Sequence, residues 1–328
     1  MVPMENSYQS IPVRVARIES VTPLIKRFTL AAVDGAPLPP FTGGSHVIVQ
    51  MRDGEQRYGN AYSLMSSPER LDSYQIGVRR ETPSKGGSAF LHDQVKEGDI
   101  LAITRPNNLF ALAEQARHHV LIAGGIGITP FMSQMHELRR HGASHELHYA
   151  FRAPEHGAFS EEIAELARDS SGQVRCYADS LGQQLDLAAL MAGLADGAHV
   201  YVCGPAGLIE AVRAAASTAG LAPERVHWEQ FAASTSAHDG AFTVVLAKSG
   251  KVVEVGAGES ILKAIERDSA VQVECLCREG VCGTCETRIL EGEAEHLDQY
   301  LSHAEQAAQK TMMICVSRAR TGKLVLDL

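Results

Sequence analysis

The chain has 328 residues, of which 45% are hydrophobic and 21% charged, and its formal net charge is −9. This length allows two or three domains that each bury a core of their own. The negative charge argues against a nucleic-acid partner or an anionic membrane surface. The sequence has no apolar run of membrane-spanning length and no apolar export segment in its first ten residues. We therefore expect a cytoplasmic protein that does not contact a membrane.

The first third of the chain is predicted to be rich in β-strands. Residues 13–18 and 26–30 alternate in polarity or carry β-branched side chains, and residues 43–50 have the pattern of a turn followed by a strand. Many short strands within roughly 110 residues are typical of a small antiparallel β-barrel.

A glycine-rich segment later in this region could bind phosphate. Lys85, Gly86, Gly87 and Ser88 precede a short amphipathic segment that we expect to be helical. Backbone N–H groups at the start of a helix, together with a serine hydroxyl, can hold a phosphate dianion. An ordinary loop in which Ser88 caps the helix would explain the same residues, and this alternative stays open.

The middle third changes to strands that alternate with helices. A buried-strand run at residues 120–123 leads into Gly124, Gly125 and Gly127, and then into a helix that we expect Thr129 to cap. The glycines would let a pyrophosphate approach the start of this helix, although their spacing is not the Rossmann fingerprint. Further strands are predicted at residues 148–151, 174–178 and 199–203. This alternation predicts an α/β domain.

The last third carries the most specific pattern in the chain. Cys277, Cys282 and Cys285 have the spacing C-x4-C-x2-C, and Cys315 follows downstream, which is the ligand spacing of a plant-type [2Fe–2S] cluster. Zinc sites usually show two paired knuckles, and a Rieske centre needs two histidines. Disulfides are disfavoured because the seven cysteines are an odd number and no export signal is present. Cys275 is spaced C-x6-C from Cys282, so we predict that it is not a ligand.

The segment from Glu274 to Thr287, continued by residues 290–293, resembles the C-terminal ferredoxin domain of the phthalate dioxygenase reductase family. Members of this family are flavin and iron–sulfur reductases that supply electrons to Rieske oxygenases. The resemblance implies three domains. They are an antiparallel β-barrel that binds FMN in residues 1–112, an α/β parallel-sheet domain that binds NAD(P)H in residues 113–232, and an α+β, β-grasp plant-type ferredoxin domain in residues 241–328.

The resemblance also implies a set of flavin-binding residues. Asn60, Ala61, Tyr62 and Ser63 resemble the R-x-Y-S flavin motif, in which the tyrosine packs on the isoalloxazine and the serine hydroxyl approaches flavin N5. Asn60 replaces the arginine that meets the flavin phosphate in the family, so another cation is needed. The candidates are Arg79, Arg80 and Lys85. The Gly86–Ser88 loop holds the FMN phosphate in the family, which favours FMN over FAD.

For the nicotinamide, Cys203, Gly204 and Pro205 resemble the C-G-P motif of the family, whose cysteine lines the nicotinamide pocket. Phe231 lies in a segment that resembles the family's E-x-F ending, where the aromatic ring lies near the flavin. Both Cys203 and Phe231 could instead be ordinary core residues. NADH is the expected donor because the family uses it, and NADPH stays open.

These features predict a reductase that passes electrons from NADH through FMN and a [2Fe–2S] cluster to a separate Rieske-type oxygenase. A hydride carries two electrons and the cluster accepts one, so a flavin must stand between them. Hydride transfer needs no acid–base residue, and we nominate none beyond Ser63. Two alternatives stay open, namely an electron-transfer subunit for another oxygenase or flavoenzyme, and a redox-responsive regulator whose cluster acts as a sensor.

Overall fold

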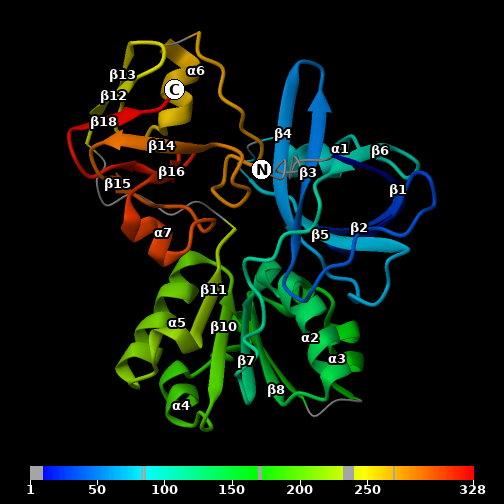
Figure 1. Ribbon diagram of the computed structural model, residues 1–328. Coiled ribbons are helices and arrows are strands. Elements are labelled where there is room, and N and C mark those ends of the chain that lie inside the picture. Colours follow the sequence, from blue (N-terminus) through cyan, green and yellow to red (C-terminus); the bar gives the residue numbers. More distant parts are fainter. Residues whose placement is uncertain (1–9, 83, 85, 169–171, 232–239, 269) are drawn as a thin grey trace. The chain divides into compact units, whose positions relative to one another are not determined.

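The computed structural model describes residues 10–82, 84, 86–168, 172–231, 240–268 and 270–328 (Figure 1). They form two compact units, the first made of residues up to 57 with 62–230 and the second of 58–61 with 231–328. Lys85 and residues 232–239 lie outside the described residues. No described helix is long and apolar enough to cross a membrane.

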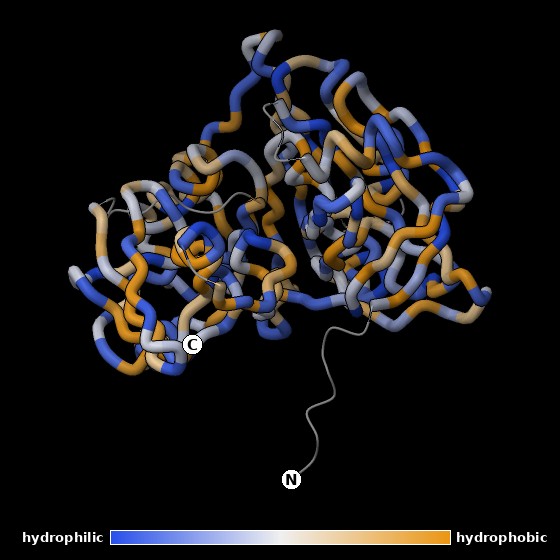
Figure 2. The backbone as a smooth tube through the Cα atoms, turned by 90° about the horizontal axis from the view of Figure 1, so that it is seen from above, coloured by the Kyte–Doolittle hydropathy of each residue, from blue (hydrophilic) through white to orange (hydrophobic). Residues whose placement is uncertain are grey.

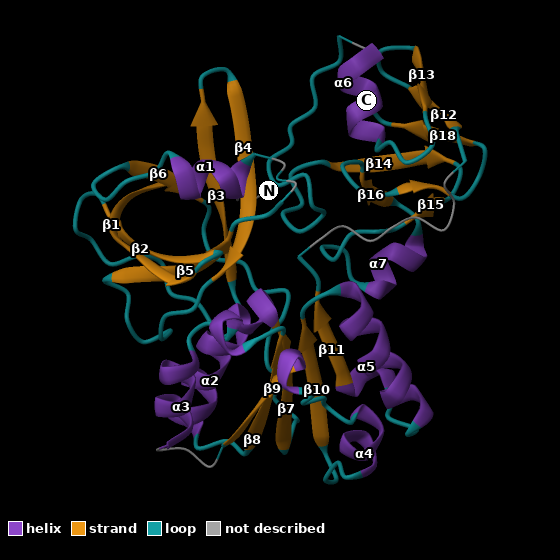
Figure 3. Cartoon of the chain, turned by 180° about the vertical axis from the view of Figure 1, so that it is seen from behind, coloured by secondary structure: helices purple, strands orange, loops and turns teal. Residues whose placement is uncertain are grey.

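An antiparallel sheet in residues 11–103 forms the predicted barrel. Its elements are β1 (Ile11–Thr22), β2 (Ile25–Ala32), β3 (His46–Asp53), β4 (Gln56–Ser63), β5 (Ser73–Arg79), α1 (Gly87–Asp93) and β6 (Ile100–Ile103). The strand order is β4-β3-β6-β1-β2-β5, and Leu64, just past β4, bridges to Ile76 of β5. The sheet therefore curls back on itself (Figure 3). Hydrophobic and hydrophilic stretches alternate along the described chain (Figure 2). In β1, Val13 and Val15 are buried and Arg14 is exposed, as expected when one face of a strand is buried.

A parallel sheet in residues 118–229 follows. Its strands are β7 (His118–Gly124), β8 (His145–Phe151), β9 (Gln173–Ala178), β10 (Ala198–Cys203) and β11 (Val226–Glu229), in the order β11-β10-β7-β8-β9. The helices are α2 (Thr129–His141), α3 (Ser160–Arg168), α4 (Leu187–Ala192) and α5 (Ala206–Thr218). Short 3-10 turns lie at Gly125–Ile128, Pro154–His156, Asp179–Leu181 and Pro223–Arg225.

The helices cover both faces of this sheet (Figures 1 and 3). Leu121 and Ala123 of β7 pack with α2 and α3, whereas Val120 and Ile122 pack with α4 and α5. A strand that is buried on both faces is hydrophobic at every position, which explains why residues 120–123 are recognisable in the sequence. The predicted antiparallel and parallel sheets are both confirmed.

Helix α2 ties the barrel to the parallel sheet. The Gly44 N–H donates to Ser133 Oγ at 3.0 Å, and Gln134 Nε2 donates to the Phe110 carbonyl at 2.6 Å. A Cβ at Gly43 would lie 2.8 Å from Gln134 Cα, so the loop needs glycine to pack this closely on the helix. These contacts hold the two sheets in one compact unit.

The second unit contains a five-stranded mixed sheet and the predicted ferredoxin fold. Its elements are β12 (Phe242–Leu246), β13 (Lys251–Val255), α6 (Ile261–Asp268), β14 (Glu286–Glu291), β15 (Ala294–Glu295), α7 (His303–Ala308), β16 (Thr311–Met313), β17 (Arg318–Ala319) and β18 (Lys323–Leu326). The main sheet has the order β13-β12-β18-β14-β16, and β15 pairs with β17. The β12–β13 hairpin forms where alternating β-branched residues flank the Ser249–Gly250 turn.

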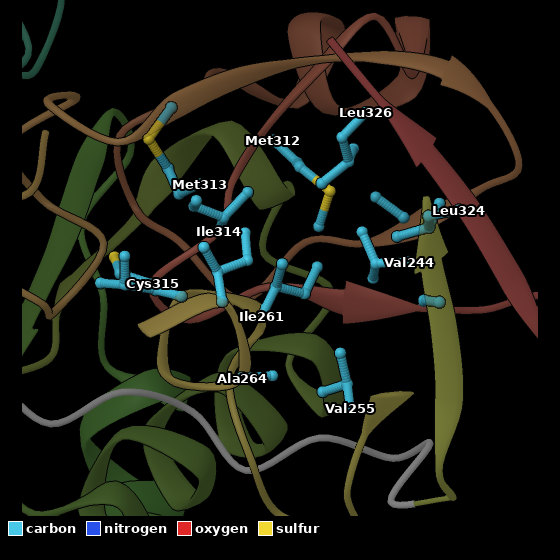
Figure 4. Packing of buried hydrophobic residues seen from close by; sticks show 14 of the residues in the cluster. Val244, Val255, Ile261, Ala264, Met312, Met313, Ile314, Cys315, Leu324 and Leu326 are labelled. Carbon is cyan, nitrogen blue, oxygen red and sulfur yellow. The ribbon is translucent and has the colours of Figure 1, made fainter. Parts of the chain in front are cut away.

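The core of this unit determines where Cys315 lies. Ile261 and Ala264 of α6 pack with Val244 of β12 and with Ile314, which follows β16 (Figure 4). Cys315 lies at the edge of the packed cluster, away from the strand residues Leu324 and Leu326 (Figure 4). The downstream cysteine is thus held by the core itself and not by a free loop.

Candidate functional site

Three side chains from two sheets meet at the carboxyl end of the parallel sheet. Ser63 ends β4, Cys203 ends β10 and Glu229 ends β11. Cys203 and Glu229 are opposite each other in the parallel pairing, with Cys203 Sγ 4.0 Å from Glu229 Oε2. The Ser63 hydroxyl approaches the same carboxyl group. Open α/β sheets bind their nucleotides at this edge, where the predicted roles of Ser63 and Cys203 would place the flavin and nicotinamide.

The buried hydroxyl of Ser63 suits a bound flavin. Ser63 is only 3% exposed, and its Oγ has no hydrogen-bond partner of good geometry among the described residues. It lies near enough to Glu229 to lower that residue's pKa, but this contact does not satisfy the hydroxyl. An unpaired buried hydroxyl costs about 1–3 kcal/mol, so a partner supplied by a ligand is indicated. A flavin ring nitrogen could be that partner.

Glu229 is the principal site residue that sequence reasoning missed. Burial raises the pKa of Glu229 to about 8, and the nearby Ser63 hydroxyl only partly opposes this shift. Burial also raises the pKa of the Cys203 thiol well above its usual value, and ionisation of Glu229 would raise it further. Both groups are therefore protonated at neutral pH. The sequence does show that Glu229 is an acidic residue at the end of a predicted strand region. Its burial beside Cys203 depends on tertiary packing and could not be predicted.

The glycines of the predicted nucleotide loop, residues 124–127, allow close packing of the backbone as well as the approach of a ligand. A Cβ at Gly127 would lie 2.2 Å from the Cys203 carbonyl oxygen, and a Cβ at Gly124 would lie 2.8 Å from Pro205 Cδ. The two loops of the predicted nicotinamide site therefore interlock through glycine. Gly125 differs, because its φ is +54° and no atom lies within 4 Å of its added Cβ. Among these glycines, Gly125 is the one that leaves open space for a nucleotide.

Thr129 has a different local role from the predicted one. It is the first residue of α2 rather than its cap, and its hydroxyl donates to the Ile126 carbonyl at 3.0 Å. The Thr129 methyl packs so closely on β5 that a Cβ at Gly77 would lie 2.8 Å from it. Thr129 thus fixes the start of α2 against the barrel, where the sequence pattern predicted a helix cap.

The two arginines proposed to hold the flavin phosphate differ in their partners. Arg80 Nη2 lies 2.5 Å from Asp93 Oδ2, and this contact raises the pKa of Arg80. The Arg79 guanidinium lies 3.8 Å from Glu81, a longer contact between two exposed side chains. Arg79 therefore has the guanidinium that is more readily available to a phosphate, while Arg80 is committed to Asp93.

The predicted phosphate loop leads directly into α1. Gly86 has a φ of +112°, which only glycine adopts readily, and α1 begins at Gly87. Ser88 Oγ accepts a hydrogen bond from the Glu81 N–H at 3.2 Å and lies 3.2 Å from Ser84 Oγ. Ser88 is thus a buried organiser of the loop in the structure, and its contact with phosphate stays a prediction.

The aromatic residues that the resemblance assigned to the flavin differ in exposure. Tyr62 is half-buried and precedes Ser63 in β4. Phe231 follows β11 and is 38% exposed. This exposure removes the core-residue alternative for Phe231, and its place near the flavin stays a prediction.

The cysteine loop of the second unit presents backbone N–H groups to sulfur. The N–H of Glu279 donates to Cys277 Sγ at 3.4 Å, and the Cys315 N–H lies within hydrogen-bonding distance of Cys285 Sγ. Gly280 and Gly283 have positive φ, and Cβ atoms there would meet neighbouring side chains at 2.7 and 2.3 Å. N–H groups stabilise thiolate ligands, so the loop fits an iron–sulfur cluster.

The four predicted ligand sulfurs lie close together. Cys277 contacts Cys282, and Cys285 contacts Cys315, with a further contact between Cys277 and Cys315. Two sulfurs per iron is the arrangement that a [2Fe–2S] cluster requires. No group of three or more His, Cys, Asp or Glu residues in the described part of the chain is arranged to hold a single metal ion. Unexpectedly, the Cys275 thiol also contacts Cys285 and Cys315.

Comparisons with known proteins identify the two regions of the chain that carry the candidate sites. The family described as "2Fe-2S iron-sulfur cluster binding domain" matches residues 244–320, and "Dimethylamine monooxygenase subunit DmmA-like, N-terminal domain" matches residues 104–226. The carnitine monooxygenase reductase subunit of Escherichia coli (strain K12) is 54% identical over 98% of this chain and 100% of its own length. The heme-dependent oxidative N-demethylase beta subunit of Ectopseudomonas mendocina (strain ymp) is 43% identical over 97% of this chain and 99% of its own.

Among solved structures, phthalate dioxygenase reductase is 35% identical, with a TM-score of 0.73 over 98% of both chains. The chain belongs to the phthalate dioxygenase reductase family. It is an oxidoreductase, an electron-transfer reductase of a two-component oxygenase system, with a [2Fe–2S] cluster-binding domain at its C-terminal end. The predicted family, fold class and enzyme class are confirmed.

We expect Cys277→Ser to abolish the visible iron–sulfur absorbance of the purified protein and Cys275→Ser to preserve it. The reason is that the C-x4-C-x2-C spacing matches the two sulfur pairs without Cys275. Absorbance spectra and iron content of the two variants check this assignment. Retention of the cluster in Cys277→Ser and its loss in Cys275→Ser would reverse the ligand assignment.

We expect Glu229→Gln to reduce the pH dependence of stability. Because the folded-state pKa of Glu229 is raised to about 8, the native carboxyl keeps a proton that the unfolded chain loses above its ordinary pKa. The free energy of unfolding should therefore fall as pH rises toward about 8, by up to ~1.4 kcal/mol per pH unit. Urea unfolding at several pH values, followed by the single tryptophan, Trp228, measures this slope.

The exposed Glu210 on α5 offers a matched control, since Glu210→Gln should leave the slope of the parent unchanged. Equal slopes in the parent and in Glu229→Gln would show that Glu229 is already ionised at neutral pH.

Proposed function

We propose that this protein oxidises NADH and delivers single electrons, by way of FMN and its [2Fe–2S] cluster, to a separate oxygenase that acts on carnitine. The observation that carries the proposal is the presence of two complementary sites in one chain. One is the buried group of Ser63, Cys203 and Glu229 at the nucleotide-binding edge of the parallel sheet. The other is the paired set of four cysteines in the second unit.

The residues assigned to each group follow from sequence and structure together. Tyr62, Ser63 and Arg79 would contact FMN, with Arg80, Lys85 and the Gly86–Ser88 loop as the other phosphate candidates. The nicotinamide nucleotide would be bound by residues of two loops, namely Gly124, Gly125, Gly127, Thr129, Cys203, Gly204 and Pro205. Phe231 would lie near the flavin. Cys277, Cys282, Cys285 and Cys315 would bind the two irons. The domain boundaries at 1–112, 113–232 and 241–328 are part of this proposal.

The protonated state of Glu229 suits hydride transfer. A neutral carboxyl beside Cys203 keeps negative charge away from the position where a nicotinamide would lie. FMN supplies the conversion between two-electron and one-electron transfer when it is bound. The protein's own residues exclude water and orient the two rings. NADH as donor and thiolates bound to iron both suit a cytoplasmic location, which we also propose.

Carnitine as the partner's substrate is supported by the 54% identity to the carnitine monooxygenase reductase subunit over the full chain. A second candidate partner is a heme-dependent oxidative N-demethylase, because its beta subunit is 43% identical over nearly the full chain. One relative is named as a reductase subunit and the other as a beta subunit. The two candidate functions therefore differ in the protein that receives the electrons, and not in the electron donor.

The proposal predicts that the purified chain oxidises NADH only slowly alone and rapidly in the presence of carnitine and the oxygenase component of carnitine monooxygenase. Oxygen consumption and NADH absorbance measure this coupling. Cys282→Ser should retain NADH-dependent ferricyanide reduction, which can draw electrons from the flavin, and lose the carnitine-dependent rate.

Coupling to the N-demethylase but not to the carnitine oxygenase would replace the first partner by the second. Negligible NADH oxidation with every one-electron acceptor would instead favour a regulatory role for the cluster.

We expect Arg79→Ala to weaken FMN binding about tenfold to a hundredfold, the usual range for a charge-assisted phosphate contact. Arg80→Ala is the matched control, because Arg80 is already paired with Asp93 and its loss should leave FMN retention near that of the parent. Flavin fluorescence released on dialysis measures the difference. Loss of FMN from Arg80→Ala alone would move the phosphate site to the other arginine.

A further inference from the structure

Four histidines, here called the histidine row, cross one face of the parallel sheet near the amino ends of its strands. His199 of β10 is opposite His119 of β7, which in turn is opposite His145 of β8. His227 of β11 is opposite Tyr201, which lies two residues beyond His199. Residues that are opposite each other, or two apart on one strand, point to the same face of a sheet. The four imidazoles therefore share the face that packs on α2 and α3.

The histidine row is buried, and its rings are closely packed. His119, His145 and His199 are each at most 5% exposed. The imidazoles of His199 and His227 are stacked with ring centroids 5.2 Å apart, and Tyr201 stacks on both His227 and His119. Neither His119 Nδ1 nor His145 Nε2 has a hydrogen-bond partner among the described residues. A proton added to either nitrogen would therefore find no acceptor there.

One contact in the row is compatible only with imidazoles that are not both charged. His199 Nδ1 lies 2.9 Å from His227 Nε2. This hydrogen bond needs one nitrogen that carries a proton and one that does not, whereas an imidazolium carries a proton on both of its nitrogens. Protonation of both rings would therefore replace the hydrogen bond by two N–H groups that point at each other.

The groups around the histidine row offer an added proton no compensating charge. His118 of β7 and Arg225, which precedes β11, act on the row electrostatically, and both oppose a further positive charge. The last turn of α2 adds only basic groups, namely Arg139, Arg140 and His141. Within the described residues, no carboxylate forms an ion pair with the row.

The carboxylates of the surrounding elements have other partners or are exposed. Glu146 of β8 binds His118 and His148 on the opposite face of the sheet. Glu137 of α2 accepts a hydrogen bond from the Gly43 N–H, and Glu162 of α3 binds Arg27. The exposed ones are Glu114, Glu161, Glu165 and Glu224.

Burial and mutual repulsion therefore favour the neutral form of these histidines. Burial, followed by the neighbouring His145 and His199, lowers the pKa of His119 to about 4, and burial, followed by His199, lowers the pKa of His227 to about 4. Burial also lowers the pKa of His145 and of His199. An unfolded chain takes up these protons at about pH 6.5, so the row stabilises the sheet above about pH 6.5 and loses this contribution as the pH falls toward about 4.

We propose that the histidine row is an acid-sensitive switch, in which proton uptake opens the amino ends of β7, β8, β10 and β11 and reversibly stops the oxidation of NADH. Strand β10 links the two ends of the sheet, because it carries His199 near its start and Cys203 at its end. Displacement of His199 would therefore disturb the site of Cys203 and Glu229, since packed interiors transmit small displacements. The loss of NADH oxidation rests on the proposed function, whereas the opening of the sheet does not.

The test compares the full-length reductase with its cofactors and the variants His119→Gln and His119→Phe, which cannot take up a proton at this position. His141→Gln is the matched control, because His141 is an exposed histidine at the end of α2 in the same unit. Hydrogen–deuterium exchange of peptides from β7 and β10 is measured at about pH 7.5 and about pH 5.5, because exchange reports local opening. Peptides from β12 and β13 in the other unit are the reference. NADH-dependent ferricyanide reduction is measured at both pH values and again after return to the higher one.

The measured quantity is the equilibrium constant for opening of β7 and β10 in the parent divided by that in each variant. For both His119 variants we expect this ratio to rise about tenfold between about pH 7.5 and about pH 5.5. One histidine with a pKa of about 6.5 in the open state and about 4 in the folded state has this effect. For His141→Gln the ratio should not change. The ferricyanide activity of the parent should fall at the lower pH and recover on return, and the His119 variants should lose less of it.

A ratio that is independent of pH would overturn the inference, because it would show that His119 acts through packing alone. Equal opening of β12 and β13 at the lower pH would also overturn it, since acid would then loosen both units alike. If neither His119 variant folds, His227→Gln takes their place with the same expected ratio, because the pKa of His227 is also about 4.

Opening of the sheet at the lower pH with undiminished NADH oxidation would overturn the link between the row and electron transfer. Absence of NADH oxidation by the parent at both pH values would instead refute the proposed function. The exchange measurement does not depend on NADH, so the two failures are distinguishable.

Discussion

The structure of the second unit depends on one constraint, the convergence of four cysteine sulfurs from two separate segments. Three come from a single loop whose glycines turn backbone N–H groups toward sulfur, and the fourth follows β16. Ile314 is fully buried beside Cys315, so the hydrophobic core fixes the fourth sulfur. Figure 4 shows this coupling, with Cys315 at the edge of the cluster formed around α6. A change in the core would therefore also disturb the metal site, because packed interiors transmit small displacements.

Burial sets the chemistry at the other site. Glu229 ends a short strand beside Cys203, and removal from water keeps its carboxyl protonated into the neutral range. Ser63 brings a hydroxyl to the same point from the barrel, which requires the barrel and the parallel sheet to be held together. The glycine contacts around α2 and between the Gly127 and Cys203 loops supply that rigidity. The packing of the barrel against the parallel sheet thus brings the backbones close together and also buries Glu229, which keeps the site uncharged.

Sequence alone predicted the features that depend on local pattern. Strict cysteine spacing indicated the cluster, and a continuous hydrophobic run indicated β7. The features it missed depend on partners distant in the chain. Glu229 became a site residue only through its burial, and Thr129 became a packing residue only because β5 lies against it. Cys275 was separated from the ligands by its spacing, yet the fold brings its thiol near Cys285 and Cys315. The local periodicity of a sequence predicts which way a side chain points, but the residues that it contacts are determined by the tertiary fold.

The central claim is that electrons from NADH reach the cysteine-bound cluster within this one chain. The most direct measurement is anaerobic addition of NADH to the purified protein, with EPR detection of the reduced cluster and no other protein present. The account predicts a reduced [2Fe–2S] signal that approaches one spin per chain and is absent from a variant lacking Cys282. Bleaching of the flavin by NADH while the cluster stays oxidised and EPR-silent would contradict it.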